Sequence, residues 1–126
     1  MDSILTTIKE LLGLTSDYNK FDSELIVQIN SVLMILSQLG VGGSRPFQIT
    51  GSEETWSDFL GDDIDRYAGV KVYIYYKVKL NWDPPTSSGI IQSMERTIAE
   101  FESRLNIQAE FFDDSDEGDA SSEASL

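Results

Sequence analysis

Residues 70–85, VKVYIYYKVKLNWDPP, constrain the fold more than any other part of the chain. Every second residue from Val70 to Leu80 is apolar, an alternation that is typical of a β-strand with one apolar face. Such a strand would be about twice the usual length, and the chain offers only the weak segment 47–49 to pair with it. We therefore predict a helix that begins at about Asp63 and ends at residues 83–85, where two prolines follow an aspartate.

This helix would be apolar around most of its circumference, which predicts that other elements cover more than one of its sides. Aspartates at its start suit the positive end of the helix dipole, and lysines near its end suit the negative one. One side carries Ile64, Tyr67, Ile74, Tyr75, Val78 and Trp82, and the other apolar residues are Val70, Tyr73, Tyr76 and Leu80.

Apolar residues at spacings of three and four predict three further helices. The first covers residues 3–12, with Asp2 or Ser3 as its cap and Gly13 at its end. The second follows Asp22, the expected N-cap, and ends before Gly40. The last begins after the segment DPPTSS, and its apolar stripe comprises Ile90, Ile91, Met94, Ile98, Phe101 and Leu105, with Thr86, Ser87 or Ser88 as cap.

Two segments lack a periodic pattern. Residues 40–61 are rich in glycine and predict a long loop, in which TWSDFL forms a turn of helix. From Asp113 onward the chain is acidic and almost without apolar residues, which is typical of disorder. The sequence thus predicts an all-α fold: a small bundle of about four helices in residues 1–109, with a long loop between helices two and three, and a disordered acidic C-terminal tail in residues 110–126.

Composition excludes several classes of function. The chain has no cysteine and no histidine, which removes thiolate chemistry, disulfides, and the commonest general base and transition-metal ligand. Its 22 acidic residues face only nine basic ones, so it is a poor non-specific ligand for nucleic acid. The N-terminal residues do not resemble a secretion signal, and the longest uncharged run is too polar to span a membrane. We expect no enzyme, no cofactor, no metal and no membrane association.

Short motifs that suggest chemistry have simpler interpretations. GVGGSR at residues 40–45 lacks the ending of a phosphate loop, so a helix end that runs into a loop is favoured. The paired Glu53 and Glu54 lie on a polar segment with nothing to raise a pKa. Helix capping is favoured over calcium binding for Asp58, Asp62, Asp63 and Asp65, and core packing over base stacking for Tyr73, Tyr75 and Tyr76 with Lys71, Lys77 and Lys79.

The order and character of these elements, with the joint YYKVKLNWDPPTSS between the last two helices, resemble the head-tail connector (adaptor) proteins of tailed double-stranded DNA bacteriophages. The resemblance covers residues 1–109 and leaves out the tail. It implies a virion structural protein, present in the host cytoplasm during assembly, that forms a homo-oligomeric ring, usually of twelve copies, beneath the portal protein. Such a ring extends the DNA channel, through which DNA passes without specific binding, and serves as a docking platform for the next tail-completion (neck) protein.

Within this hypothesis, apolar residues near the C-terminus are candidates for portal docking, and aromatic residues elsewhere for lateral contacts between subunits. For Trp56 and Phe59, packing within the subunit's own core is an equal alternative. The docking candidates are Phe101, Leu105, Ile107, Phe111 and Phe112, and the lateral candidates are Trp56, Phe59, Tyr73, Tyr76 and Trp82.

An alternative of a different class also fits the composition. Seven acidic residues and no basic one follow Ala109, so the chain could be a regulatory or DNA-mimic protein that captures a basic partner through its tail. Deletion of residues 113–126 would abolish such capture and leave ring contacts in place.

Overall fold

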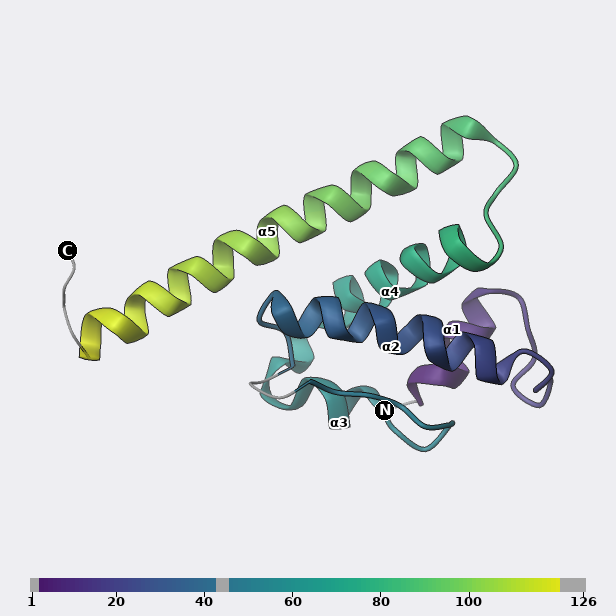
Figure 1. The fold of residues 1–126 in the computed structure, drawn as a ribbon, viewed down its shortest axis with the longest axis horizontal. Coiled ribbons are helices and arrows are strands. Elements are labelled where there is room, and N and C mark those ends of the chain that lie inside the picture. The colour runs from purple at the N-terminus through teal and green to yellow at the C-terminus, as the bar shows by residue number, and fades with distance from the viewer. Residues whose placement is uncertain (1–2, 43–45, 121–126) are drawn as a thin grey trace.

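The computed structural model describes the backbone of residues 3–42 and 46–120, and the side chains of these residues as far as Leu105. Helices dominate, and the described residues contain no β-strand beyond one isolated bridge between Ser3 and Thr55. The expected all-α bundle is confirmed (Figure 1). Its elements in chain order are α1 (Ile4–Leu11), α2 (Asp22–Gln38), α3 (Trp56–Leu60), the 3₁₀-helix η1 (Gly61–Arg66), α4 (Tyr67–Trp82) and α5 (Ser88–Ala120).

The alternating stretch is helical, as predicted, and forms α4 at the centre of the fold. The helix begins at Tyr67 rather than at about Asp63, because the acidic residues before it form η1. Three elements pack against α4, namely α1, α2 and α5. This contact on several sides explains how a helix with apolar residues around most of its surface is accommodated in the bundle.

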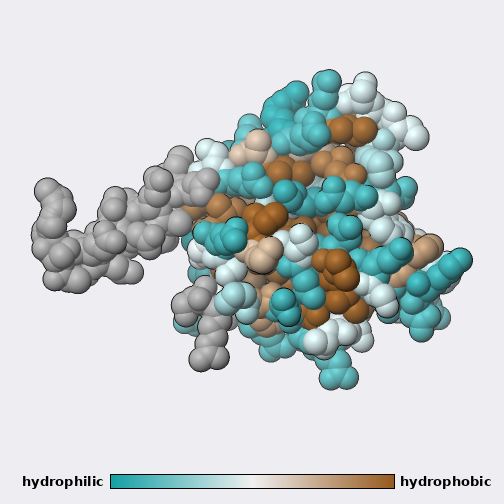
Figure 2. Space-filling view, in the orientation of Figure 1, coloured by the Kyte–Doolittle hydropathy of each residue, from teal (hydrophilic) through white to brown (hydrophobic). Residues whose placement is uncertain are grey.

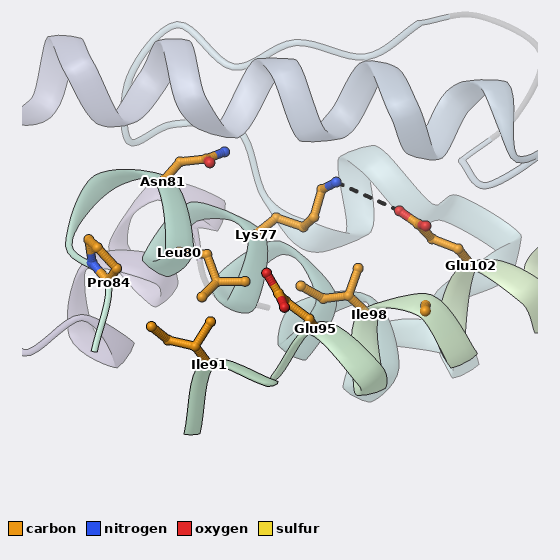
Figure 3. Close-up of a pocket in the computed structure, with 9 residues that line it drawn as sticks. Lys77, Leu80, Asn81, Pro84, Ile91, Glu95, Ile98 and Glu102 are labelled. Atoms are coloured by element: carbon orange, nitrogen blue, oxygen red, sulfur yellow. Dashed lines mark ion pairs between the residues drawn. The ribbon is translucent and has the colours of Figure 1, made fainter. Parts of the chain in front are cut away.

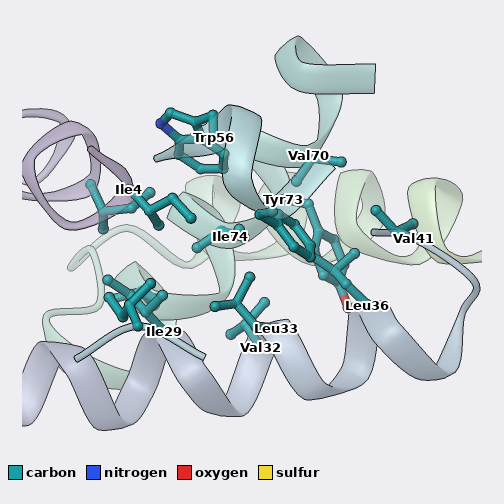
Figure 4. Close-up of a cluster of buried hydrophobic side chains, with 14 of the residues drawn as sticks. Ile4, Ile29, Val32, Leu33, Leu36, Val41, Trp56, Val70, Tyr73 and Ile74 are labelled. Carbon is teal, nitrogen blue, oxygen red and sulfur yellow. The ribbon is translucent and has the colours of Figure 1, made fainter. Parts of the chain in front are cut away.

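The hydrophobic core lies mainly between α1, α2, α3 and α4 (Figure 4). Val70, Ile74 and Val78 of α4 are fully buried against this side of the molecule. Each such side chain contributes roughly 1.5–3 kcal/mol through removal of apolar surface from water. The other fully buried large side chains include Ile4, Leu5, Ile8, Leu25, Ile29, Leu33, Leu36, Ile49 and Trp56.

The first two helices end in the same way, with a glycine in the left-handed region. Gly13 and Gly40 both have φ of 88°, a conformation that strains residues with a side chain. The amide of the following residue then bonds a carbonyl of the last helical turn, Leu14 to Lys9 at 2.8 Å and Val41 to Leu36 at 2.9 Å. Both helix ends were predicted from the position of the glycine.

Asp22 does not act as the N-cap of α2, contrary to expectation. Phe21 occupies that position, and the Asp22 carboxylate lies 2.9 Å from Nζ of Lys9. The Lys9 side chain is almost fully buried and also donates a hydrogen bond to the Ser16 carbonyl at 3.0 Å. A buried ammonium group requires partners of this kind, so the Asp22 carboxylate forms an ion pair with Lys9 instead of capping the start of α2.

The long loop between α2 and α3 is held against the helices. The Asn30 side chain donates to the Ile49 carbonyl at 3.0 Å and accepts from the Ile49 amide at 2.7 Å. Further along, the Ile4 amide donates to the Glu54 carbonyl at 3.0 Å. The Trp56 indole donates to the hydroxyl of Thr7 at 3.0 Å in the buried interior. These bonds fix the later part of the loop, from Ile49 to Trp56, against α1 and α2.

The final helix is capped as predicted, and its backbone continues further than expected. Ser87 accepts a hydrogen bond from the Ile90 amide at 3.3 Å, so one of the three proposed caps is used. The helix extends to Ala120, past the predicted domain boundary at residue 109. That boundary, and the predicted disorder of residues 110–126, stay predictions.

Replacement of Asn30 by alanine should loosen the loop, because it leaves the buried amide and carbonyl of Ile49 without a partner. We expect Asn30→Ala to lower the free energy of unfolding by about 2 kcal/mol, as measured by urea denaturation. Hydrogen exchange should also accelerate at the Ile49 amide. Ser31→Ala, at an exposed neighbouring position, serves as the control. Equal stability of the two variants would contradict the role given to Asn30.

Candidate docking surfaces

The joint between α4 and α5 is built around Tyr73. Its ring stacks on Phe101 with centroids 5.2 Å apart, and its hydroxyl donates to the Glu102 carboxylate at 2.6 Å. Lys77 lies 3.7 Å from the same carboxylate and 5.8 Å from the centre of the Tyr73 ring. Burial first, and then the hydrogen bond and negative charge of Glu102, raise the pKa of the Tyr73 hydroxyl above its ordinary value of 10.0.

Gly69 allows the two helices to approach closely at this joint. A Cβ atom at this position would lie 2.6 Å from Cε2 of Phe101, which is shorter than van der Waals contact permits. Gly69 has a helical backbone conformation that any residue can adopt, so the glycine is required for its lack of a side chain and not for its backbone freedom. Sequence reasoning missed this glycine, although a glycine inside a predicted helix often marks a close packing contact.

A groove of about 510 Å³ opens on one side of the same joint (Figure 3). Apolar side chains from both helices line it, with Leu80 from α4 and Ile91 and Ile98 from α5. The charged groups at its edge are Lys77, Glu95 and Glu102, of which Lys77 and Glu102 are paired. The groove therefore combines an apolar floor from both helices with a charged edge.

The predicted lateral-contact residues divide into two groups. Trp56 is fully buried, and Phe59 and Tyr73 are each only 2% exposed, so a neighbouring subunit could reach them only if the core opened. Tyr76 and Trp82 are half-buried and accessible from outside. The lateral-contact hypothesis therefore depends on Tyr76 and Trp82. Trp56, Phe59 and Tyr73 lie in the subunit's own core, which was the alternative considered for Trp56 and Phe59.

The predicted portal-docking residues begin inside the bundle and continue beyond it. Leu105 is buried and Phe101 half-buried against α4, so both act first as packing residues of the subunit. Ile107, Phe111 and Phe112 have side chains outside the described residues. The backbone of α5 carries these positions away from the rest of the molecule, and this part of the helix projects past the other elements in Figure 1.

Sequence reasoning missed an exposed apolar surface on α2. Val27 and Met34 are 67% and 53% exposed, and they lie on the side of α2 that faces away from the core. Figure 2 shows hydrophobic side chains at the surface among polar ones on the face where α2 lies. The signal was present, because both residues are apolar and fall outside the stripe that the core residues form.

The acidic residues considered for calcium binding have structural roles in part. Asp58 and Thr55 form a reciprocal pair at the start of α3, in which each side chain accepts from the other's amide, at 3.0 and 3.1 Å. Asp63 accepts weakly from the Gly42 amide at 3.5 Å. Within the described part of the chain, no group of three or more acidic residues could hold a metal ion, and no helix there has the length and apolarity to cross a membrane.

The described residues form a small helical bundle with apolar side chains exposed on several elements. Comparison with protein families found that residues 4–111 match the phage connector protein family, and the chain belongs to that family. The resemblance noted from the sequence is thereby confirmed. The chain is a structural connector component of a phage virion, and membership implies association with phage portal and tail proteins. Searches of curated proteins and of solved structures found no match.

Replacement of Tyr73 by phenylalanine should weaken the α4–α5 joint in a pH-dependent way. The folded chain holds the hydroxyl proton more tightly than the unfolded chain, so this stabilisation is complete below pH 10 and declines as pH rises above it. We expect Tyr73→Phe to cost about 1 kcal/mol at pH 7, and the difference from the parent to shrink between pH 10 and pH 11.5. Chemical denaturation across that range measures it.

Tyr75→Phe is the matched control, because the described residues give the Tyr75 hydroxyl no hydrogen-bond partner. It should show a small difference at every pH. A Tyr73→Phe difference that stays constant to pH 11.5 would contradict the link to Glu102.

Proposed function

We propose that this chain is the subunit of a ring, usually of twelve copies in such assemblies, that lies beneath the portal at the head-tail interface. The ring extends the DNA channel and offers its lower surface to the next tail-completion protein. The observation that carries this proposal is the family match, which spans all the helices of the bundle and reaches into the projecting part of α5.

The projecting part of α5 is the proposed portal-docking element. Fifteen residues follow Leu105 in this helix, a length of about 22 Å at 1.5 Å per residue. Phe112 follows Phe101 by eleven residues, which is about three helical turns. The spacing predicts that the apolar stripe of α5 continues past the bundle, where a groove between portal helices could receive it. The family match ends at Phe111, within this segment.

The charge of the chain supports the proposed channel. Acidic residues outnumber basic ones by 22 to nine. A ring of such subunits presents few cations to phosphate, and neutralisation of phosphates by lysine and arginine supplies most non-specific affinity for DNA. DNA would therefore move through the lumen without being held.

Replacement of both Phe111 and Phe112 by alanine tests the docking element without touching the bundle. Because two buried aromatic anchors each commonly contribute about 2 kcal/mol or more to an interface, we expect the double variant to bind the portal protein at least tenfold more weakly. Titration of the labelled chain with purified portal measures this change. Circular dichroism should show an unchanged melting temperature.

Two controls belong to this experiment. Asp113→Ala combined with Asp114→Ala alters the adjacent positions and should leave portal affinity within about twofold of the parent. Deletion of residues 113–126 should likewise preserve portal binding. If the chain instead captures a basic partner through its acidic tail, the same deletion should abolish binding to that basic partner. Parent-like affinity of the Phe111→Ala, Phe112→Ala variant would refute docking through this segment.

A further inference from the structure

The exposed side of α2 and the long loop together form a groove of about 420 Å³. We name this surface the α2 face and define it by Val27, Ser31 and Met34 of α2, with Pro46, Phe47 and Gln48 of the loop. The small Ser31 lies between the two exposed apolar residues, four positions after Val27 and three before Met34. On a helix these three positions share one side.

The α2 face has a fixed shape before any partner arrives. The two hydrogen bonds between Asn30 and Ile49 hold the loop next to α2. Phe47 also contacts the buried Phe59, with ring centroids 5.3 Å apart. Because these contacts hold Phe47 and Ile49 in place, a partner that binds here loses little affinity to ordering of this segment.

A second apolar surface lies on the other side of the molecule. We name it the α4 face and define it by Val72 and Tyr76 of α4 with Thr97 of α5, which line a shallow cleft together with Phe101. Val72 is 37% exposed, and Tyr76 is half-buried. Val72 is two residues from both Val70 and Ile74, which corresponds to about 200° around the helix.

This geometry makes the two faces point in opposite directions. Val70 and Ile74 are buried in the core, on the side where α2 packs, so Val72 points away from α2. Val27 and Met34 in turn point away from α4. Two unlike surfaces on opposite sides of one chain suit a head-to-tail contact between copies, which closes as a ring when the rotation between copies permits.

The charges of the two helices are complementary. Within its bounds, α2 contains two acidic residues, Asp22 and Glu24, and no basic one. The helix α4 contains three lysines, Lys71, Lys77 and Lys79, and no acidic residue. Several of these charges are already paired within the subunit: Asp22 with Lys9, Lys77 with Glu102, and Lys79 with Asp83. Among the salt bridges of the described residues, Glu24 of α2 and Lys71 of α4 take no part. Contact between the α2 face of one copy and the α4 face of the next therefore brings the acidic Glu24 and the basic Lys71 to the same interface, whereas contact between two α2 faces would bring two copies of Glu24 together.

We propose that the α2 face of one copy binds the α4 face of the next, so that this contact is the lateral interface between subunits. The inference rests on the proposed ring and assigns its lateral surfaces. The buried aromatic residues Trp56 and Phe59 have no direct part in it, and Tyr73 contributes only as the buried wall of the cleft on the α4 face. Tyr76 remains a lateral-contact residue.

The absence of cysteine from the chain allows a test without background reactivity. The double variant Met34→Cys, Val72→Cys places one thiol on each face, at positions that are both exposed. The variant is mixed with the portal protein of the same phage, and a short bis-maleimide is added. We expect a ladder of covalent multimers on a denaturing gel. Each single variant should give at most a trace of dimer.

The matched control is Met34→Cys combined with Gln92→Cys. Gln92 is exposed and lies on a different side of α5 from Thr97, the α5 residue of the α4 face. This pair should give no ladder. Abundant dimers from Met34→Cys alone would show an α2-to-α2 contact and overturn the inference. A multi-copy complex with the portal that shows no Met34–Val72 ladder would also overturn it, and would leave the proposed function intact. Failure to assemble with the portal at all would contradict both.

Discussion

The burial of α4 on several sides is the constraint on which the rest of the structure depends. A sixteen-residue helix with apolar residues around most of its surface has to be covered by other elements on more than one side. The core side of α4 is covered by α1 and α2, and its other side by α5 through Tyr73 and Phe101. Because α5 is held mainly through α4, the same helix fixes the direction in which the long C-terminal helix leaves the bundle (Figure 1).

That arrangement explains how the chain can carry out the structural role of its family. The bundle supplies a rigid body, and its surfaces differ in character from one side to another. The α4–α5 joint has an apolar groove with charged edges, α2 exposes apolar side chains beside residues 46–48 of the loop, and the end of α5 projects. Connector proteins need several distinct contacts at once, and the contacts proposed for this chain lie on different elements.

Much of the fold could be predicted from the sequence, because the signals were local. The helix in residues 67–82 followed from the two prolines after it and the lack of a partner strand, and Gly13 and Gly40 marked helix ends through their own conformational freedom. Long-range pairings had no such signal. Asn30 bonds Ile49, which is nineteen residues away, and Asp22 pairs with Lys9 instead of capping α2. Both pairings depend on the folded structure and have no signal in the local sequence.

The candidate surfaces were harder to predict than the fold. Aromatic residues suit both cores and interfaces, so the sequence could not decide whether Trp56, Phe59 and Tyr73 face inward or outward. The structure buries all three. Conversely, Val27 and Met34 are ordinary apolar residues in a helix rich in them, and their exposure depends on which side of α2 meets α4. The direction of a side chain is a property of packing, which periodicity alone does not specify.

The central claim is that this connector family member binds the portal as a ring subunit. Native mass spectrometry of the purified chain, alone and mixed with the portal protein of the same phage, tests it most directly. The account predicts a stoichiometric complex with close to one copy per portal subunit, whether or not the chain alone is a monomer. A mixture in which portal and chain remain separate under conditions that keep the portal assembled would contradict it.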